Sequence, residues 1–409
     1  MKRLSIVGLI LIISFIAYNI YTSNDQKIDN DGTYSNELQL QPVFTAKTNM
    51  KIAPLFSEEI KMLNVGVEMV DNYFISARVK GEDGHSYYFR EAEEGNKKII
   101  FYKDNKIKVC ETVMPTKLRK EGCSIFRFVQ YKDRIFVELR GRKSYLSAIQ
   151  IANGRWENII ENSELLNRIF VYNNDFVCVY DEKVEVHSFD GGKSSFELEQ
   201  YGENTEISIQ CIVDGKIYYF YMDEDSEKNK TTNMQVKCCD LAGKNKKLLF
   251  YYEQGSAMSS WYDSLRIEKE YMYLLRDYTL LRIPLYGGKI ERVSGKKMYF
   301  YDISDNYIFF LDEAKGNLHK INKDLSGEVK MVRKPGPCDR DVPFICVKDY
   351  ILVKECNQKQ EQQIADIVEN DLSNSNIQRE YISDYCWMTE NGEVQEILQG
   401  SGFRKKWQK

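Results

Sequence analysis

The stretch from Glu270 to Val332 decides the fold, because it contains one short pattern twice. Residues 270–293 read EYMYLLRDYTLLRIPLYGGKIERV, and residues 306–332 read NYIFFLDEAKGNLHKINKDLSGEVKMV. Each copy consists of short apolar runs, many of them aromatic, separated by turns that carry Gly or Asn. A unit of this kind, repeated in tandem, predicts one sheet of an array.

The same unit recurs from residue 43 onward as a turn residue followed by a strand. The expected turn residues are Asn72, Asp133, Asn174, Asp214, Glu270, Asn306 and Asp349. Subtracting successive residue numbers gives spacings of 61, 41, 40, 56, 36 and 43. Most of these lie near the roughly 40–50 residues of a four-stranded propeller blade. We therefore predict an all-β fold, a β-propeller of four-stranded blades over residues 43–400, with seven blades expected and six or eight as alternatives.

Each of the two long spacings can be explained by a segment of the sequence. The polar insert Asp223–Asn233 lies in the gap of 56 residues. In the gap of 61 residues, the run from Asp104 to Cys110 could be an eighth, degenerate copy.

The second half of most units repeats as a hairpin, with strand runs on both sides of a turn rich in Gly and Asn. These hairpins are expected at residues 148–160, 184–198, 235–250, 280–293 and 384–398. Asn-Gly and Gly-Gly supply the positive φ that tight hairpins need. Turn chemistry and strand pattern therefore agree, and agreement between two levels of sequence signal favours the propeller.

The run from Leu280 to Lys289, LLRIPLYGGK, resembles the repeat of a propeller domain of unknown function found in cell-surface proteins of Gram-positive anaerobes. That domain is similar to the low-density-lipoprotein-receptor and TolB-type propellers, and the likeness is clearest over residues 207–332. The receptor-type Tyr-Trp-Thr-Asp signature is replaced by residues 271–274 and by residues 309–312. The resemblance implies a propeller at the cell surface and carries over no catalytic or ligand-binding residue.

Composition narrows the function classes. The chain has 409 residues, of which 43% are hydrophobic and 29% charged, values typical of a globular protein. Its 28 Tyr and 20 Phe against 7 Pro favour pleated sheets. The net charge of −4 provides no basic footprint for nucleic acid, so no nucleic-acid partner is expected.

The N-terminal end predicts membrane targeting. Residues 1–3 are Met-Lys-Arg, and the apolar segment at residues 4–21 just reaches across a hydrocarbon core of roughly 30 Å. Residues 1–24 therefore predict a hydrophobic helix that is a signal anchor or a signal peptide. Because the basic end stays inside, we expect a single-pass cell-membrane protein with its C-terminal domain outside, or a secreted protein if the segment is cleaved. A buried helix of a cytosolic domain is the remaining alternative.

The segments flanking the blades are predicted separately. Residues 25–42 are polar and predict a tether, in which residues 27–32 lack the flanking ligands of a calcium loop. Residues 43–55 are expected to pair with the last sheet and close the ring. Residues 357–380 predict an inserted helix or a disordered excursion, and residues 401–409 a basic tail.

Signals for chemistry are few. His85, His187 and His319 lie in different units without a His or Cys at ligand spacing, so neither a metal site nor a catalytic triad is expected. No phosphate loop, dinucleotide fingerprint or Gly-x-Ser-x-Gly occurs, and we expect no cofactor. The acidic run at residues 223–227 is followed by Lys228, which indicates a solvated loop rather than a cation site.

The ten cysteines show no disulfide framework. Cys178, Cys211, Cys346 and Cys386 lie in apolar strand contexts, where a free thiol behaves as a small hydrophobe, and Cys238 and Cys239 are neighbours in one strand. The pairs to check for a disulfide are Cys110 with Cys123 and Cys338 with Cys346.

These observations favour a membrane-anchored, extracytoplasmic propeller that acts as a non-catalytic binding or scaffold module. Its partner would be a protein, a peptide or a cell-wall glycan, bound by loops on a rigid ring. Trp261 and Tyr262 are candidates for stacking against such a ligand, with core packing as the alternative role. A second hypothesis is a hydrolase or lyase acting on polysaccharide or peptide, with carboxylates from several blades at the channel mouth. A sensory ectodomain is disfavoured, because only residues 1–3 would remain inside.

Overall fold

The computed structural model divides the chain into two compact units, Met1–Gln39 and Leu40–Lys409. All residues that the structure describes belong to the second unit. They are residues 51–52, 54–55, 64–71, 78–91, 97–104, 106–162, 166–180, 183–199, 205–223, 233–253, 264–334, 344–355, 377–380, 384–398 and 404–407. The predicted N-terminal helix and the polar tether therefore lie outside the described residues. Within the described part of the chain, no helix has the length and hydropathy needed to cross a bilayer.

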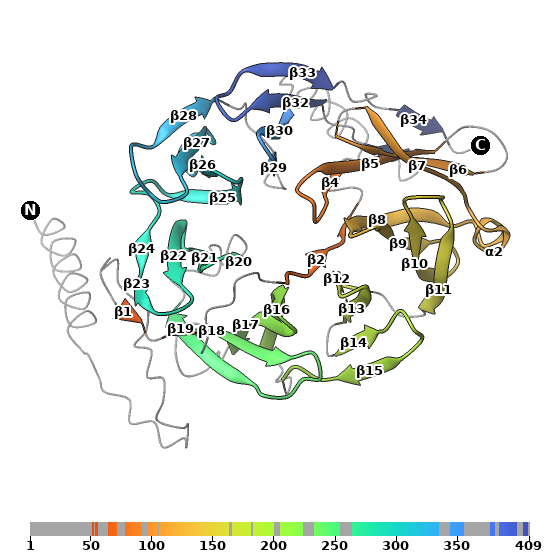
Figure 1. Ribbon diagram of the computed structural model, residues 1–409, viewed down its shortest axis with the longest axis horizontal. Helices are drawn as coiled ribbons and strands as arrows, with labels where there is room; N and C mark the ends of the chain where they lie inside the picture. The colour runs from red at the N-terminus through yellow and green to blue at the C-terminus, as the bar shows by residue number, and fades with distance from the viewer. Residues whose placement is uncertain are drawn as a thin grey trace, which may run out of the picture. The chain divides into compact units, whose positions relative to one another are not determined.

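Seven antiparallel sheets follow one another around an axis, which confirms the predicted seven-bladed propeller (Figure 1). The first three blades consist of β4 (Arg78–Lys80), β5 (Ser86–Glu91), β6 (Lys98–Lys103) and β7 (Ile107–Val113); β8 (Ser124–Tyr131), β9 (Arg134–Arg140), β10 (Ser144–Gln150) and β11 (Trp156–Asn162); and β12 (Arg168–Tyr172), β13 (Asp175–Val179), β14 (Val184–His187) and β15 (Lys193–Phe196). The short helix α2 (Thr116–Lys120) connects the first blade to the second.

The other four blades have the same meander order. They consist of β16 (Thr205–Val213), β17 (Lys216–Asp223), β18 (Asn233–Asp240) and β19 (Lys247–Glu253); β20 (Ser264–Glu268), β21 (Tyr271–Arg276), β22 (Thr279–Pro284) and β24 (Glu291–Arg292); β25 (Met298–Ile303), β26 (Tyr307–Asp312), β27 (Leu318–Asn322) and β28 (Lys330–Arg333); and β29 (Phe344–Val347), β30 (Tyr350–Glu355), β32 (Asp384–Thr389) and β33 (Val394–Leu398).

The turn between the first two strands of a blade explains the sequence spacing. In five blades this turn has two residues, and its first residue has a φ between 48° and 52°; these residues are Lys132, Asn173, Asp214, Lys269 and Lys348. Positive φ at this place gives the hairpin the twist of its strands. The predicted hairpins at residues 148–160, 184–198, 235–250, 280–293 and 384–398 are confirmed as the outer strand pairs of their blades.

The first blade differs from the prediction. Its inner hairpin turns at residues 81–85, whereas Asn72 precedes the blade and lies outside the described residues. The expected eighth copy at residues 104–110 is wrong, because the described part of this run forms the turn and start of β7 within the first blade. The first strand of this blade is short and its turn has five residues, so a search for two-residue turns does not find it.

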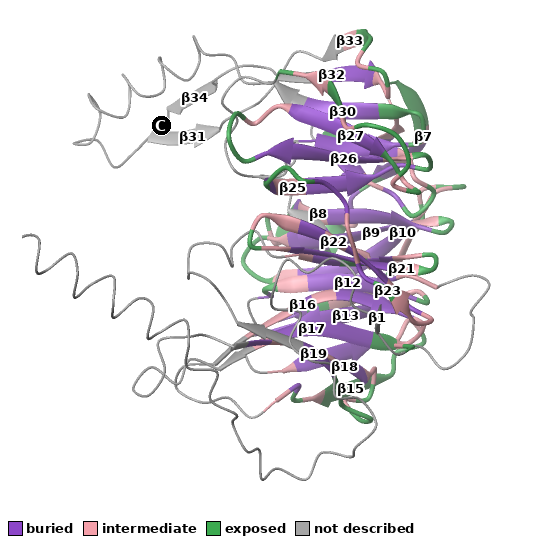
Figure 2. Cartoon of the chain, turned by 90° about the vertical axis from the view of Figure 1, so that its left-hand side faces the viewer, coloured by how far each residue is buried: buried purple, intermediate pink, exposed green. Residues whose placement is uncertain are grey.

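Apolar side chains from facing sheets fill the space between neighbouring blades. Phe89 of the first blade meets Phe128 of the second edge to face at 5.4 Å, and Phe136 of the second meets Phe176 of the third at 5.2 Å. Such aromatic pairs add to the burial of apolar area. The buried residues run along the middle of the strands, as Figure 2 shows.

The cysteines follow the prediction where the structure describes them. Cys110, Cys123, Cys178, Cys211, Cys238, Cys239 and Cys346 are buried free thiols, and Cys386 is buried as well. The pair Cys110 and Cys123 therefore forms no disulfide, and Cys338 lies outside the described residues. Burial raises the pKa of the Cys211 thiol to about 12, so this thiol stays protonated and packs as an apolar group.

Of residues 43–55, which were expected to close the ring, the structure describes residues 51–52 and 54–55, and the strand among them does not pair with the last sheet. Residues 51–52 form β1 (Lys51–Ile52), which pairs with β23 (Gly288–Lys289) of the fifth blade and not with the last sheet. Farther along the chain, residues 356–376 lie outside the described residues, and β31 (Ile377–Glu380) pairs with β34 (Arg404–Trp407). The end of the predicted insert and part of the predicted basic tail are therefore strands.

Residues 64–71, which we call the axial segment, add a strand to the inner edges of three blades. Val65 and Gly66 bind β16, β2 (Val67–Glu68) pairs with β12, and β3 (Val70–Asp71) pairs with β8. The segment thus crosses the fourth, third and second blades in turn, near the middle of the ring (Figure 1). All seven blades consist of strands close in sequence, and the innermost strands of the last and first blades contact each other. The axial segment therefore supplies a link between blades that strand exchange does not provide.

Asn64 joins the axial segment to the inner turns of these blades. Its backbone N–H donates to Asp214 Oδ1 at 2.8 Å, and its Nδ2 donates to Asn173 Oδ1 at 2.6 Å. Its Oδ1 accepts a bond from the Tyr131 hydroxyl at 3.4 Å. One side chain thus connects the second and third blades to the segment that crosses them.

We predict that Asn64→Ala lowers the free energy of unfolding by about 1–2 kcal/mol, because two side-chain hydrogen bonds are lost while the backbone bonds remain. Urea denaturation followed by tryptophan fluorescence measures the change. Asn306→Ala is the matched control, since Asn306 is an exposed turn residue of the sixth blade whose side chain has no hydrogen bond among the described residues. Equal losses in the two variants would contradict the linking role of Asn64.

Candidate functional site

The innermost strands are tied to one another by side chains as well as by packing. In five neighbouring pairs of blades, a side chain of one innermost strand, or of the loop beside it, bonds the next blade. These bonds are Asp83 N to Gln130 Oε1, Arg127 to Leu166 O, Leu265 N to Gln210 Oε1, Arg266 to Asp302, and Cys346 N to Asp302. Arg168 makes a sixth such contact, to Ile209 O. Polar side chains therefore surround the axis.

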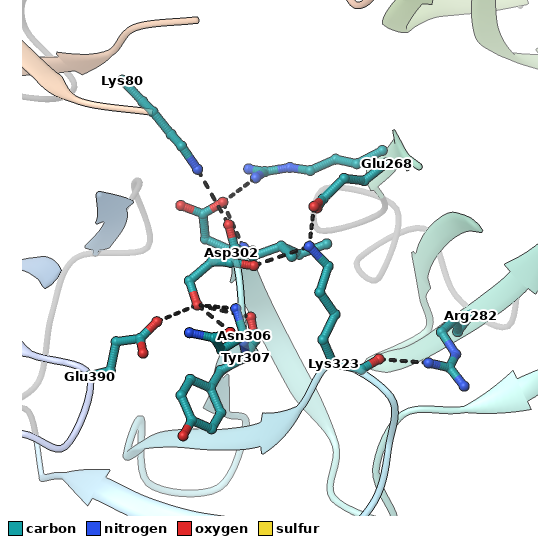
Figure 3. A network of polar contacts seen from close by, with 11 residues as sticks. Lys80, Glu268, Arg282, Asp302, Asn306, Tyr307, Lys323 and Glu390 are labelled. Carbon is teal, nitrogen blue, oxygen red and sulfur yellow. Dashed lines mark hydrogen bonds and ion pairs between the residues drawn. The ribbon is translucent and has the colours of Figure 1, made fainter. Parts of the chain in front are cut away.

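The axial segment divides these strands into two groups. Within the described residues, β8, β12 and β16 carry an added strand at the inner edge, whereas β4, β20, β25 and β29 carry none. The second group contains an unusual set of charges, which we take as the candidate site (Figure 3).

Asp302 of β25 is the centre of this site. Its side chain is 5% exposed, and it accepts bonds from Arg266, from the Ile303 N–H at 2.9 Å and from the Cys346 N–H at 2.7 Å. Burial alone would raise the pKa of this carboxyl group. Lys80, Arg266 and the two N–H groups outweigh that effect and hold its pKa below the usual value. Asp302 is therefore an ionised acceptor at neutral pH.

Lys80 and Arg266 leave donors unused among the described residues. Lys80 of β4 donates one hydrogen bond, to Ile303 O at 3.3 Å. Arg266 of β20 binds Asp302 through Nη1, while its side chain remains 45% exposed. A guanidinium has five N–H groups and an ammonium three. Two cations thus face one buried carboxylate, which leaves an excess of one positive charge beside the axis.

Two further carboxylates of the same network, Glu268 and Glu390, have partners of their own. Lys323 forms an ion pair with Glu268 and donates to Ser304 O at 3.1 Å. The Ser304 hydroxyl binds Glu390 Oε1 at 2.5 Å, which joins the sixth blade to the seventh. These contacts surround Asp302 in Figure 3 and fix the turn that follows β25.

The residues singled out by sequence are not part of this site. Trp261 and Tyr262 lie outside the described residues, so their role stays a prediction. Each of the histidines bonds a carboxylate on its own blade: His85 with Asp104 at 2.8 Å, His187 with Glu185 at 3.1 Å, and His319 with Asp312 at 2.7 Å. No group of three His, Cys, Asp or Glu side chains in the described ranges could hold a metal ion.

Glu185 is the most strongly perturbed of these carboxylates. Burial opposes its ionisation, but hydrogen bonds from Lys193, Tyr180 and His187 outweigh burial and lower its pKa to about 2. Burial also lowers the pKa of His187. Both groups are saturated by partners inside the third blade, which indicates a structural role. The acidic run at residues 223–227 lies outside the described residues beyond Asp223, the last residue of β17.

Sequence reasoning missed Lys80, Arg266 and Asp302, although one signal for the arginine was present. Arg127, Arg168 and Arg266 all precede the inner turn of their blade by a few residues and are followed by an aromatic or branched apolar residue. Alignment of the strands on their turns would have shown Arg127 and Arg168 at the same position, four residues before the strand end, with Arg266 displaced from it by two residues. Asp302 has no such signal, because its burial depends on three other blades.

The chain has distant similarity to several solved structures. No protein-family model and no curated protein matches the chain. It is similar to BamB from Moraxella catarrhalis, at 10% identity over 67% of this chain and 80% of that chain, with a TM-score of 0.37. It is also similar to a chain of the nidogen/laminin complex, at 9% identity over 68% of this chain and 95% of that chain, with a TM-score of 0.33. It is similar as well to the β-propeller domain of the Trilobed protease from Pyrococcus furiosus, which has an open velcro topology. The sequence identity is 10%, the match covers 83% of this chain and 97% of that chain, and the TM-score is 0.43.

We predict that Asp302→Ala lowers the free energy of unfolding at pH 7 by on the order of 3 kcal/mol, because Arg266 and two N–H groups lose a buried acceptor. Asp302→Asn keeps one acceptor oxygen and should cost less. Asp305→Asn, which changes an exposed residue of the same hairpin, is the control. Urea denaturation measures all three.

The same variants test the pH dependence. Since the folded-state pKa of Asp302 lies below the unfolded value of about 3.9, its contribution is present above that value and is lost as the pH falls through the folded pKa. The wild type should lose more stability than Asp302→Asn between about pH 5 and pH 3. Parallel curves for the two proteins would show that Asp302 is not stabilised in its ionised form.

Proposed function

We propose that the chain is a membrane-anchored, extracytoplasmic binding module without chemistry of its own, and that its ligand is a protein, a peptide or a cell-wall glycan. The observation that carries this proposal is the pair of axial cations, Lys80 and Arg266, whose donors exceed the acceptors among the described residues. Unused cationic donors that are held by packed strands suit recognition, because little side-chain freedom is lost when a ligand binds.

The charges of the site favour binding over hydrolysis. A glycosidase-type mechanism needs one carboxyl group with a raised pKa as the acid and a second as nucleophile or base. Around the axial cations, Asp302 has a lowered pKa, Glu268 is paired with Lys323 and Glu390 accepts the Ser304 hydroxyl. These three carboxylates act as acceptors of internal bonds.

A binding screen tests the proposed function. The full chain, purified in detergent, is presented with cell-wall glycans, peptidoglycan fragments, peptides and surface proteins, while released product is measured in the same wells. We expect saturable binding without product for at least one class. Product release would favour the hydrolase or lyase, and the absence of binding in every class would contradict the proposal.

Membrane topology is tested on its own. The apolar segment at residues 4–21 and the basic residues before it support an orientation with the C-terminal part outside. We expect a C-terminal tag on the full chain to be digested when protease is added to intact spheroplasts, and to remain in the membrane pellet without protease. A protected tag would contradict the orientation, and a tag in the medium would favour the secreted alternative.

A further inference from the structure

Arg168 and Arg266 make similar contacts in the third and fifth blades, although Arg168 lies four residues before the end of β12 and Arg266 two residues before the end of β20. Each lies on an innermost strand, β12 or β20, and each guanidinium bonds the innermost strand of the next blade. Arg168 reaches Ile209 O in this way, and Arg266 reaches Asp302. The two arginines differ in their second partner.

The second partner of Arg168 is Glu68 of the axial segment. Arg168 Nε donates to Glu68 Oε1 at 2.7 Å, and its Nη2 donates to Glu68 Oε2 at 3.2 Å. The backbone of Glu68 pairs with Phe170 on the same strand, β12. An extended piece of chain thus adds to an inner edge and places a carboxylate in the two-pronged grip of an arginine, which is a favoured geometry for this pair.

Arg266 has no second carboxylate among the described residues. Its strand, β20, also carries no added strand there, and its side chain is 45% exposed. The ring of Tyr301 lies 5.4 Å from the guanidinium and helps to hold its plane. Lys80 of β4, which extends toward Asp302 in Figure 3, supplies the second cation.

We propose that Arg266 and Lys80 bind the carboxylate side chain of an extended acidic peptide segment of a partner protein, as Arg168 binds Glu68. This inference rests on the proposed binding function and names its ligand class. The chain's own segment favours a peptide over a glycan, because it shows that inner edges of this ring accept an extended backbone together with a carboxylate. Glycans with acidic sugars also carry a carboxylate, but they have no peptide backbone that could pair with the inner edge of a strand.

The axial segment provides the probe. A peptide with blocked ends and the sequence of residues 64–71, carrying Asp71→Asn so that Glu68 is its one carboxylate, is titrated into the full chain at low ionic strength. A second peptide carries Glu68→Gln in addition. We expect saturable binding of the first peptide, binding about tenfold or more weaker for the second, and loss of affinity as salt is added.

The site is tested on the protein side by variants that keep the fold. Arg266→Gln combined with Asp302→Asn replaces the ion pair by a neutral hydrogen-bonding pair, and the half-buried Lys80 is then the remaining charge of the site. Lys80→Gln removes the other cation alone. Lys108→Gln, which removes an exposed cation from β7 at the outer edge, is the matched control. Far-ultraviolet circular dichroism and thermal melting establish that each variant is folded.

We expect the double variant and Lys80→Gln each to weaken binding of the first peptide by about tenfold or more, and the control to leave it unchanged. Equal binding of the two peptides, equal binding by all variants, or no binding of the first peptide by the wild type would overturn the inference. Binding of an oligosaccharide with uronic acid through Arg266, without peptide binding, would overturn the peptide class. If the peptide fails while the screen finds another ligand, the inference fails and the proposed function stands; if both fail, the proposed function fails as well.

Discussion

The innermost strand of each blade has one edge without a neighbour in its own sheet, and the rest of the ring depends on how that edge is satisfied. Backbone N–H and C=O groups that are removed from water need partners. In the second, third and fourth blades the axial segment provides them, through paired residues such as Val67 with Val171. Around the axis, side chains such as Gln130 and Arg127 bond the neighbouring blade. These contacts hold together a ring whose first and last blades share no strand within the described residues.

Arginine is suited to this position for a physical reason. Its long side chain can leave the strand, cross to the next blade and still retain donors for a carboxylate. Arg127 meets Glu138 at 3.6 Å, and Arg168 binds both Glu68 and a neighbouring carbonyl. Each cation then has a counter-charge, which limits the cost of placing it between packed sheets. Arg266 follows the same rule with Asp302, but it shares that carboxylate with Lys80.

The sequence was sufficient to predict the blades, but it was not sufficient to predict the contacts around the axis. Turn residues such as Asp214 and the outer hairpins have a local cause, positive φ next to alternating strands, so they can be predicted from a few neighbouring residues. The axial segment has no such signature, because it pairs only two residues with each of β12 and β8 and its partners are distant in sequence. Asn64, for example, bonds Asp214, 150 residues away. Asp302 lies in a run that predicts an ordinary strand, and only the convergence of Lys80, Arg266 and Cys346 makes it a buried hub.

The different exposures of Asp302 and Arg266 bear on the properties of the site beside β20 and β25, where the described residues include no added strand. At 5% exposure, the Asp302 carboxylate has given up its water to internal donors, whereas at 45% exposure Arg266 still meets solvent. Bringing a second carboxylate to Arg266 would therefore require no further dehydration of Asp302, and it would offset the excess charge from Lys80. Because charges interact more strongly at a partly buried site than in bulk water, a carboxylate there gains more from the two cations than it would at an exposed pair. The bond between Arg266 and Asp302 thus both links two blades and orients the exposed part of the guanidinium.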